Sequence, residues 1–261
     1  MLLKEKIMVS KIDSMPETPR RFRLHEHPWI AWLVSIAVVV FSIYLMGVII
    51  FGVLGWQEDK PLSQFVHGTA HHFLMVFLLM PFLLRLPKGK IPYRDYLDRI
   101  GLTKIKPFFK LVLLALSCYL ILALCQLSAS IIFRLFEGYP ITWRFLRQVL
   151  DVSGDLPPVS AGLLTTIPSM FEELVNRGVL LTTFRNKYSD WEAIIFSALG
   201  FGLIHLLNLV MGRELVWVFG QVVWSFLIGL FYGYVFVRTG SLLPSMIVHY
   251  LGNAFIGSFT W

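Results

Sequence analysis

Long apolar segments alternate with short polar ones along most of this chain. Each apolar segment has about the 20 residues that a helix needs to cross the hydrocarbon of a bilayer. We therefore predict an all-α fold, a polytopic transmembrane helix bundle of about seven spans with short interfacial helices. The predicted spans cover residues 29–54, 64–86, 108–134, 160–184, 191–211, 215–237 and 240–260. The last two are separated only by a tight turn at Arg238-Thr239-Gly240.

Composition supports a lipid environment. The chain is 56% hydrophobic and only 15% charged, whereas soluble domains carry about a quarter charged residues. The net charge of +7 would also suit a nucleic-acid-binding protein, but no such motif is present. We therefore expect the lipid bilayer, and no nucleic acid, to be a partner of this chain. Cys118 and Cys125 lie two helical turns apart, which is too far for a disulfide.

The distribution of basic residues predicts the orientation. Most of the 23 lysines and arginines fall before the first predicted span or in the loops on that same side, which places the N-terminus in the cytoplasm. We expect a multi-pass integral protein of the plasma (cell inner) membrane. Residues 1–28 are predicted to form a cytoplasmic basic segment, and residues 29–150 the N-terminal transmembrane helices and interfacial loops. Residues 160–261 are predicted to form a catalytic helical core.

Two segments within that second region contain amphipathic or mixed sequences. Residues 91–106 combine Tyr, Leu and Ile with basic residues and are expected on the cytoplasmic surface. Residues 141–150 place Trp143, Leu146 and Leu150 at helical spacing, which predicts a short interfacial helix on the outer face. A solvated loop with an aromatic anchor fits this second segment about equally well.

The predicted span 160–184 contains three charged residues in its middle. Glu173 and Arg177 are i, i+4 and can pair along one helix face. Glu172 is rotated from Glu173 by about 100° and points elsewhere. Acidic groups at this depth are costly unless they are paired or line a watery cavity. A structural ion pair explains Glu173 and Arg177 but not Glu172.

Two later spans carry polar residues at a similar depth. His205 lies in the span 191–211, and His249 and Asn253 share one face of the span 240–260. At 1.5 Å per residue, Glu172, His205 and His249 lie roughly 14–22 Å from the cytoplasmic ends of their spans. Such agreement across three helices predicts one functional site.

The residue types suggest hydrolysis by an activated water, because no Ser or Cys lies beside a suitable base. Glu172 would take the proton from the water, and His205 would share that role or orient the water. His249 and Asn253 would stabilise the oxyanion, and Glu173 and Arg177 would hold the site together or steer the substrate. Alternatively, Glu172, His205 and His249 would bind a divalent metal such as Zn2+. The residues alone leave the cofactor, none or metal, open.

The motifs Glu-Glu-x-x-x-Arg at 172–177, Phe-x-x-x-His at 201–205 and His-x-x-x-Asn at 249–253 resemble those of the CPBP family, also called Abi. This family includes type II CAAX prenyl endopeptidases and bacteriocin-processing or self-immunity proteins. The resemblance covers about residues 160–260 and implies an intramembrane endopeptidase whose site opens to the cytosol. It implies catalytic roles for Glu172, His205, His249 and Asn253, and a peptide or protein substrate in or at the membrane.

Three alternatives accompany this prediction. One is a non-catalytic immunity or scaffold protein, and another is a small proton-coupled transporter that uses Glu172 and the histidines as a relay. The third concerns His67, His71 and His72 near the outer end of the second predicted span, of which His67 and His71, four residues apart, would chelate a second metal. We favour polar residues facing the interface, on the opposite side from the main cluster. Pro168 and Pro244 are expected to kink their helices near the cluster.

Overall fold

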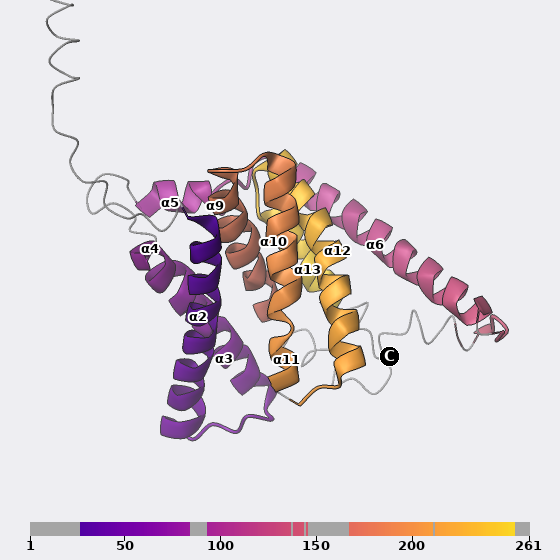
Figure 1. The fold of residues 1–261 in the computed structure, drawn as a ribbon, viewed down its shortest axis with the longest axis horizontal. Coiled ribbons are helices and arrows are strands. Elements are labelled where there is room, and N and C mark those ends of the chain that lie inside the picture. Colours follow the sequence, from indigo (N-terminus) through magenta and orange to yellow (C-terminus); the bar gives the residue numbers. More distant parts are fainter. Residues whose placement is uncertain are drawn as a thin grey trace, which may run out of the picture.

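The described part of the chain folds into helices (Figure 1). The computed structural model describes residues 27–83, 93–136, 138–143, 145, 167–210 and 212–253. Every regular element over these residues is helical, which confirms the predicted all-α class. Residues 1–26 and most of the predicted interfacial helix 141–150 lie outside the described residues.

Within the described ranges, four helical runs are long and apolar enough to cross a membrane. They are Pro28–Val53, Phe108–Phe136, Asp190–Val210 and Leu215–Thr239. The other predicted spans, 64–86, 160–184 and 240–260, each extend into residues that the structure does not describe. The chain is thus a membrane protein with at least these apolar helices, and a total of about seven spans stays a prediction.

The N-terminal part is a pair of contacting helical runs. The first run consists of α2 (Pro28–Gly47) and the π-helix η2 (Val48–Val53), and the second of α3 (Pro61–Phe73), η3 (Leu74–Leu79) and α4 (Met80–Leu83). Both runs begin with a proline in the first turn, where the missing N–H costs no helical hydrogen bond. This pair contacts the segment that carries the two glutamates.

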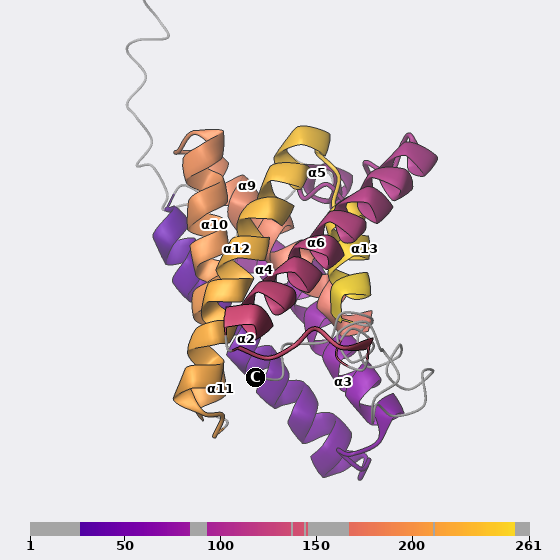
Figure 2. The ribbon, with the colours of Figure 1, turned by 90° about the vertical axis from the view of Figure 1, so that its right-hand side faces the viewer.

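The C-terminal part supplies the elements of the motifs. A helix over residues 167–173 continues directly into the π-helix η4 (Leu174–Leu181). The elements that follow are α9 (Thr182–Arg185), α10 (Asp190–Ile204), α11 (Leu207–Val210), α12 (Leu215–Thr239) and α13 (Leu243–Leu251). Helices α10 and α12 lie side by side in both views (Figures 1 and 2). Small residues permit this approach: a Cβ on Gly229 of α12 would lie 3.0 Å from Cβ of Ala198 on α10.

Local sequence signals explain where these helices begin and end. Ser189 and Glu192 form a reciprocal capping box at the start of α10. Gly240 ends α12 in the left-handed conformation with φ of 66°, which confirms the predicted tight turn. Pro244 lies in the first turn of α13, so it starts this helix and the predicted kink is wrong.

Residues 93–106 are mostly exposed, as a surface segment would be, but a few of their apolar residues reach the interior. They include α5 (Tyr93–Arg99), whose Tyr96 is buried, and Ile100 is also buried. Gly101 accepts a hydrogen bond at its carbonyl from the backbone N–H of Leu242 at 3.1 Å. The apolar residues of this segment therefore attach it to the turn between α12 and α13.

Helix α6 (Phe108–Phe136) slants away from the other helices in Figure 1 and contacts α13. Both cysteines of the chain lie on it; Cys118 is buried, Cys125 is exposed, and both are free thiols. This agrees with the predicted absence of a disulfide between them.

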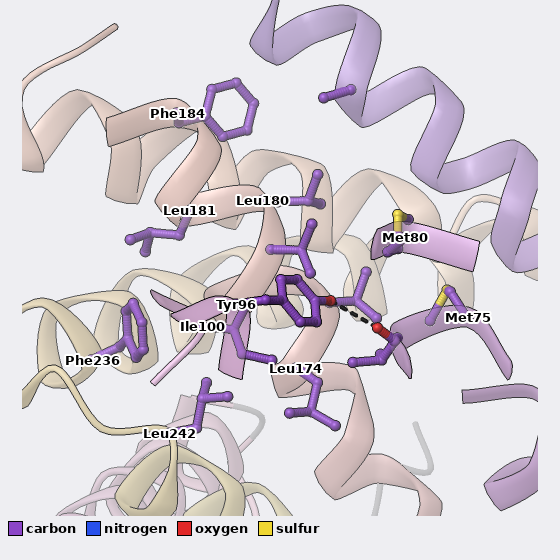
Figure 3. Close-up of a cluster of buried hydrophobic side chains, with 14 of the residues drawn as sticks. Met75, Met80, Tyr96, Ile100, Leu174, Leu180, Leu181, Phe184, Phe236 and Leu242 are labelled. Carbon is purple, nitrogen blue, oxygen red and sulfur yellow. Dashed lines mark hydrogen bonds between the residues drawn. The ribbon is translucent and has the colours of Figure 1, made fainter. Parts of the chain in front are cut away.

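An apolar cluster surrounds η4 (Figure 3). Met75 and Met80 lie on one side of it, and Phe236 and Leu242 lie on another. The hydroxyl of Tyr96 donates a hydrogen bond to the carbonyl of Val76 at 2.8 Å and so links α5 to η3. All eight residues of η4 are buried, so this core fixes the helix that follows the two glutamates.

Candidate functional site

Glu172 and Glu173 stand at the junction between the helix 167–173 and η4. The Glu173 side chain is 0% exposed and the Glu172 side chain is 36% exposed. The rotation of about 100° between adjacent helical residues accounts for this difference. As the sequence predicted, the two carboxylates have different surroundings.

Glu173 is the acceptor of a buried charge cluster. Its Oε1 accepts a hydrogen bond from Nη1 of Arg177 at 2.8 Å, and both side chains are fully buried. The guanidinium also lies over the rings of Phe201, at 4.5 Å, and Tyr232, at 5.3 Å. Two aromatic faces and a carboxylate together compensate the charge of Arg177 in the interior.

His249 of α13 lies between the two glutamates. Its Nδ1 lies 2.9 Å from Oε1 of Glu173, and its Nε2 lies 3.9 Å from Oε2 of Glu172. The first distance is a hydrogen bond, in which the ring nitrogen donates to the carboxylate, whereas the second is too long for one. Phe201 and Tyr232 flank the imidazole with ring centroids at 5.8 and 5.6 Å. The ring is thereby fixed in orientation, with Nε2 directed at the more exposed carboxylate.

His205 marks a break in the fifth predicted span. Helix α10 ends at Ile204, and residues 205 and 206 turn before α11 begins. The Nδ1 of His205 donates a hydrogen bond to the carbonyl of Phe201 at 2.8 Å. Since a carbonyl only accepts, Nδ1 carries the hydrogen, and the neutral ring keeps a lone pair on Nε2. Phe201 also lies 5.3 Å from this ring, so it touches both motif histidines.

Two hydrogen bonds of Asn176, one of them to α10, link α10 to the glutamate helix. Nδ2 of Asn176 donates to the backbone carbonyl of Glu172 at 2.8 Å. The hydroxyl of Ser197 donates to the backbone carbonyl of Asn176 at 2.7 Å. No role was predicted for Asn176 from the sequence. Its position four residues after Glu172, inside an apolar span, was the available signal.

The asparagines of the later motifs lie apart from this charge cluster. Asn253 is exposed near the end of the described chain, and no hydrogen bond between described residues joins it to Glu172, His205 or His249. Asn208 donates from Nδ2 to Oε1 of Gln221 at 2.7 Å, which joins α11 to α12.

His72 of α3 lies beside the helix that carries the two glutamates. The sequence analysis placed it on the opposite side from the main cluster, and that placement is wrong. His72 is buried, its ring lies 6.1 Å from that of Phe171, and it interacts electrostatically with Glu172 and His249. The packing of α3 against the helix 167–173, which brings His72 beside Phe171, has no signal in the sequence pattern.

The candidate zinc ligands do not converge. Over the described residues, no group of three or more His, Cys, Asp or Glu side chains is placed to hold a metal ion. The arrangement of Glu172, His205 and His249 therefore does not fit a metal site, and we derive no chemical step from one.

Comparison with known proteins finds one family model that matches the C-terminal part of the chain. Residues 155–255 match the family model described as type II CAAX prenyl endopeptidase Rce1-like. No curated protein and no solved structure matches the chain. The matched residues contain all three motifs and every contact of the Glu173 cluster. The match over residues 155–255 supports the assignment of this part of the chain to the CAAX protease family.

Proposed function

We propose that this protein is an intramembrane endopeptidase that hydrolyses a peptide bond of a membrane-associated peptide or protein. The observation that carries the proposal is His249 between two adjacent carboxylates, one buried and paired, the other partly exposed. A purely structural ion pair would not need the second glutamate. In the proposed site, Glu173 and Arg177 hold the imidazole, and Glu172 is free to act on a water.

The proposed reaction uses no covalent enzyme intermediate. Glu172 takes a proton from a water molecule, and the water oxygen attacks the carbonyl carbon of the scissile peptide. His205, through the lone pair on Nε2, orients this water. His249 in its imidazolium form, together with Asn253, donates hydrogen bonds to the oxyanion. The proton on Glu172 then passes to the leaving nitrogen as the C–N bond breaks.

The family description suggests the first substrate to test, a prenylated peptide that ends in a CAAX sequence. A peptide pheromone, a bacteriocin leader or a membrane protein would use the same chemistry. We propose a location in the plasma (cell inner) membrane, with the N-terminus in the cytoplasm and about seven spans.

The decisive experiment removes only the proposed base. Purified protein is incubated with an internally quenched farnesylated CAAX peptide, and the membrane and secreted peptides of expressing cells are compared by mass spectrometry. Glu172→Gln should lower cleavage by about 100-fold or more. Glu58→Gln, at an exposed loop position, is the matched control and should cleave like wild type.

Two outcomes would overturn the proposal. Undiminished cleavage by Glu172→Gln would remove the proposed mechanism. If no peptide in either assay depends on the wild-type protein, the non-catalytic or transporter alternatives would take its place.

A further inference from the structure

We propose that His72 of α3 is a positioning residue of this site, which acts through the carboxylate of Glu172. The inference rests on the proposed function and adds an imidazole from outside the three motifs. It begins with the packing of α3 against the helix 167–173. A Cβ at Gly68 would lie 2.7 Å from Cγ of Pro168, so the backbone of α3 approaches this proline directly.

His72 lies one helical turn after Gly68, so the close approach at Gly68 also brings His72 near the helix that carries the glutamates. The two rings of His72 and Phe171 lie 6.1 Å apart, and Phe171 directly precedes Glu172. His72 is 8% exposed, which is unusual for a polar ring without a binding or structural task. The contact between Gly68 and Pro168 and the ring contact between His72 and Phe171 thus lie along the same side of α3, which packs against the glutamate helix.

The orientation of His72 is fixed by the same glycine. Its Nδ1 lies 2.6 Å from the carbonyl oxygen of Gly68. Because this oxygen only accepts, Nδ1 carries a hydrogen, and the neutral ring presents Nε2 as an acceptor. A hydrogen bond from one ring nitrogen to a backbone carbonyl determines which nitrogen of a histidine faces other groups.

The carboxylate of Glu172 lacks a close side-chain partner among the described residues that would fix its orientation, and His72 can supply one. This carboxylate is 36% exposed, and its ion-pair partner His249 is 3.9 Å away, beyond hydrogen-bond distance. His72 interacts electrostatically with both of these residues. One bridging water that donates to Nε2 of His72 and to Glu172 would hold the carboxylate toward the substrate.

The other histidines of α3 provide the contrast. His71 stacks on His72 with ring centroids 4.0 Å apart, and His67 follows at 5.7 Å from His71. The Nε2 of His67 lies 3.0 Å from the carbonyl oxygen of Ile43 on α2. His67 therefore connects α3 to α2 and serves as the matched control for His72.

The experiment measures kcat and KM for cleavage of the farnesylated CAAX peptide, or of a peptide that the cell comparison identifies. His72→Ala should lower kcat by up to about 100-fold through misplacement of the base, with little change in KM. His72→Gln should recover much of the loss because its side-chain carbonyl can accept from the same water, whereas His72→Leu should not. His67→Ala should cleave like wild type.

A second measurement does not depend on activity. Thermal unfolding of His72→Ala, Glu172→Gln and the double variant in detergent forms a double-mutant cycle. The two changes in Tm should fail to add, because the residues interact. Additive changes would overturn the inference, as would full activity of His72→Ala or equal losses in His72→Ala and His72→Gln.

These results separate the inference from the proposed function. An inactive Glu172→Gln beside a fully active His72→Ala removes only the role of His72. An active Glu172→Gln removes the proposed mechanism, whatever the double-mutant cycle reports.

Discussion

His249 and Arg177 share a single oxygen atom. Oε1 of Glu173 accepts Nδ1 of His249 at 2.9 Å and Nη1 of Arg177 at 2.8 Å. The three side chains come from η4, the residue before it, and α13, and none is more than 5% exposed. The position of His249 therefore depends on the Glu173–Arg177 pair, which the four-residue spacing in the sequence had predicted.

This relationship predicts that substitution of Glu173 mainly lowers stability, whereas substitution of Glu172 mainly lowers activity. Glu173→Gln leaves Arg177 buried without its counter-charge and should lower the free energy of unfolding by about 3–5 kcal/mol. Glu172→Gln changes a partly exposed carboxylate and should alter it by less than about 0.5 kcal/mol. Thermal unfolding in detergent measures both. Equal destabilisation by the two substitutions would contradict the distinction.

The contact between α10 and α12 predicts a steric effect on the site. A Cβ at Gly229 would lie 3.0 Å from Cβ of Ala198 and 3.2 Å from Nη2 of Arg177. Gly229→Ala should therefore destabilise the protein by about 1–3 kcal/mol and reduce cleavage. Gly220→Ala lies in the same helix with no atom within 4 Å of its Cβ position. It should leave the Tm unchanged or raise it, since alanine favours helix.

The burial of Tyr96 predicts that the protein loses stability at alkaline pH. Burial raises the pKa of the Tyr96 hydroxyl above its ordinary value of 10. The folded state thus holds this proton more tightly than the unfolded state. The stabilising contribution is complete below the unfolded pKa and is lost as pH rises above about 10. The Tm of wild type should fall more steeply between about pH 9 and 11 than that of Tyr96→Phe. Parallel curves would show that the tyrosine does not contribute.

The spacing of the site donors predicts the response to chelators. Glu172, His205 and His249 are not grouped as metal ligands. Cleavage by protein dialysed against EDTA should therefore equal that of untreated protein, and elemental analysis should find no stoichiometric zinc. Activity that is lost with EDTA and restored by Zn2+ would mean that the three side chains converge in the working enzyme.

Helix periodicity was sufficient for contacts within one helix. The four-residue spacing predicted the Glu173–Arg177 pair, and the rotation between neighbours predicted the separate environment of Glu172. Comparable depths anticipated that His249 would approach the glutamates. In each case the prediction needed only the rise and turn of an α-helix, which vary little between proteins.

Contacts between helices were harder to predict, because periodicity gives the face of a helix but not its crossing angle. Nothing in the apolar pattern of α3 indicated that Gly68 would meet Pro168 and direct His72 toward Glu172. The burial of Tyr96 and Ile100 was also missed, since the basic residues around them suggested a surface loop. A hydrophobicity pattern also does not register the end of α10 at Ile204, where Nδ1 of His205 bonds to the carbonyl of Phe201.

The segment η4 has no side that faces outward, because all eight of its residues are buried by neighbouring helices. Its charge is therefore solvated by protein groups, and the surrounding lipid never has to accommodate Arg177. The side chains of such a segment need not be hydrophobic, but they must fit the volume that the neighbouring helices leave. Substitutions within it should be tolerated according to their size and hydrogen bonding, and hydropathy should be a poor guide to which of them the fold accepts.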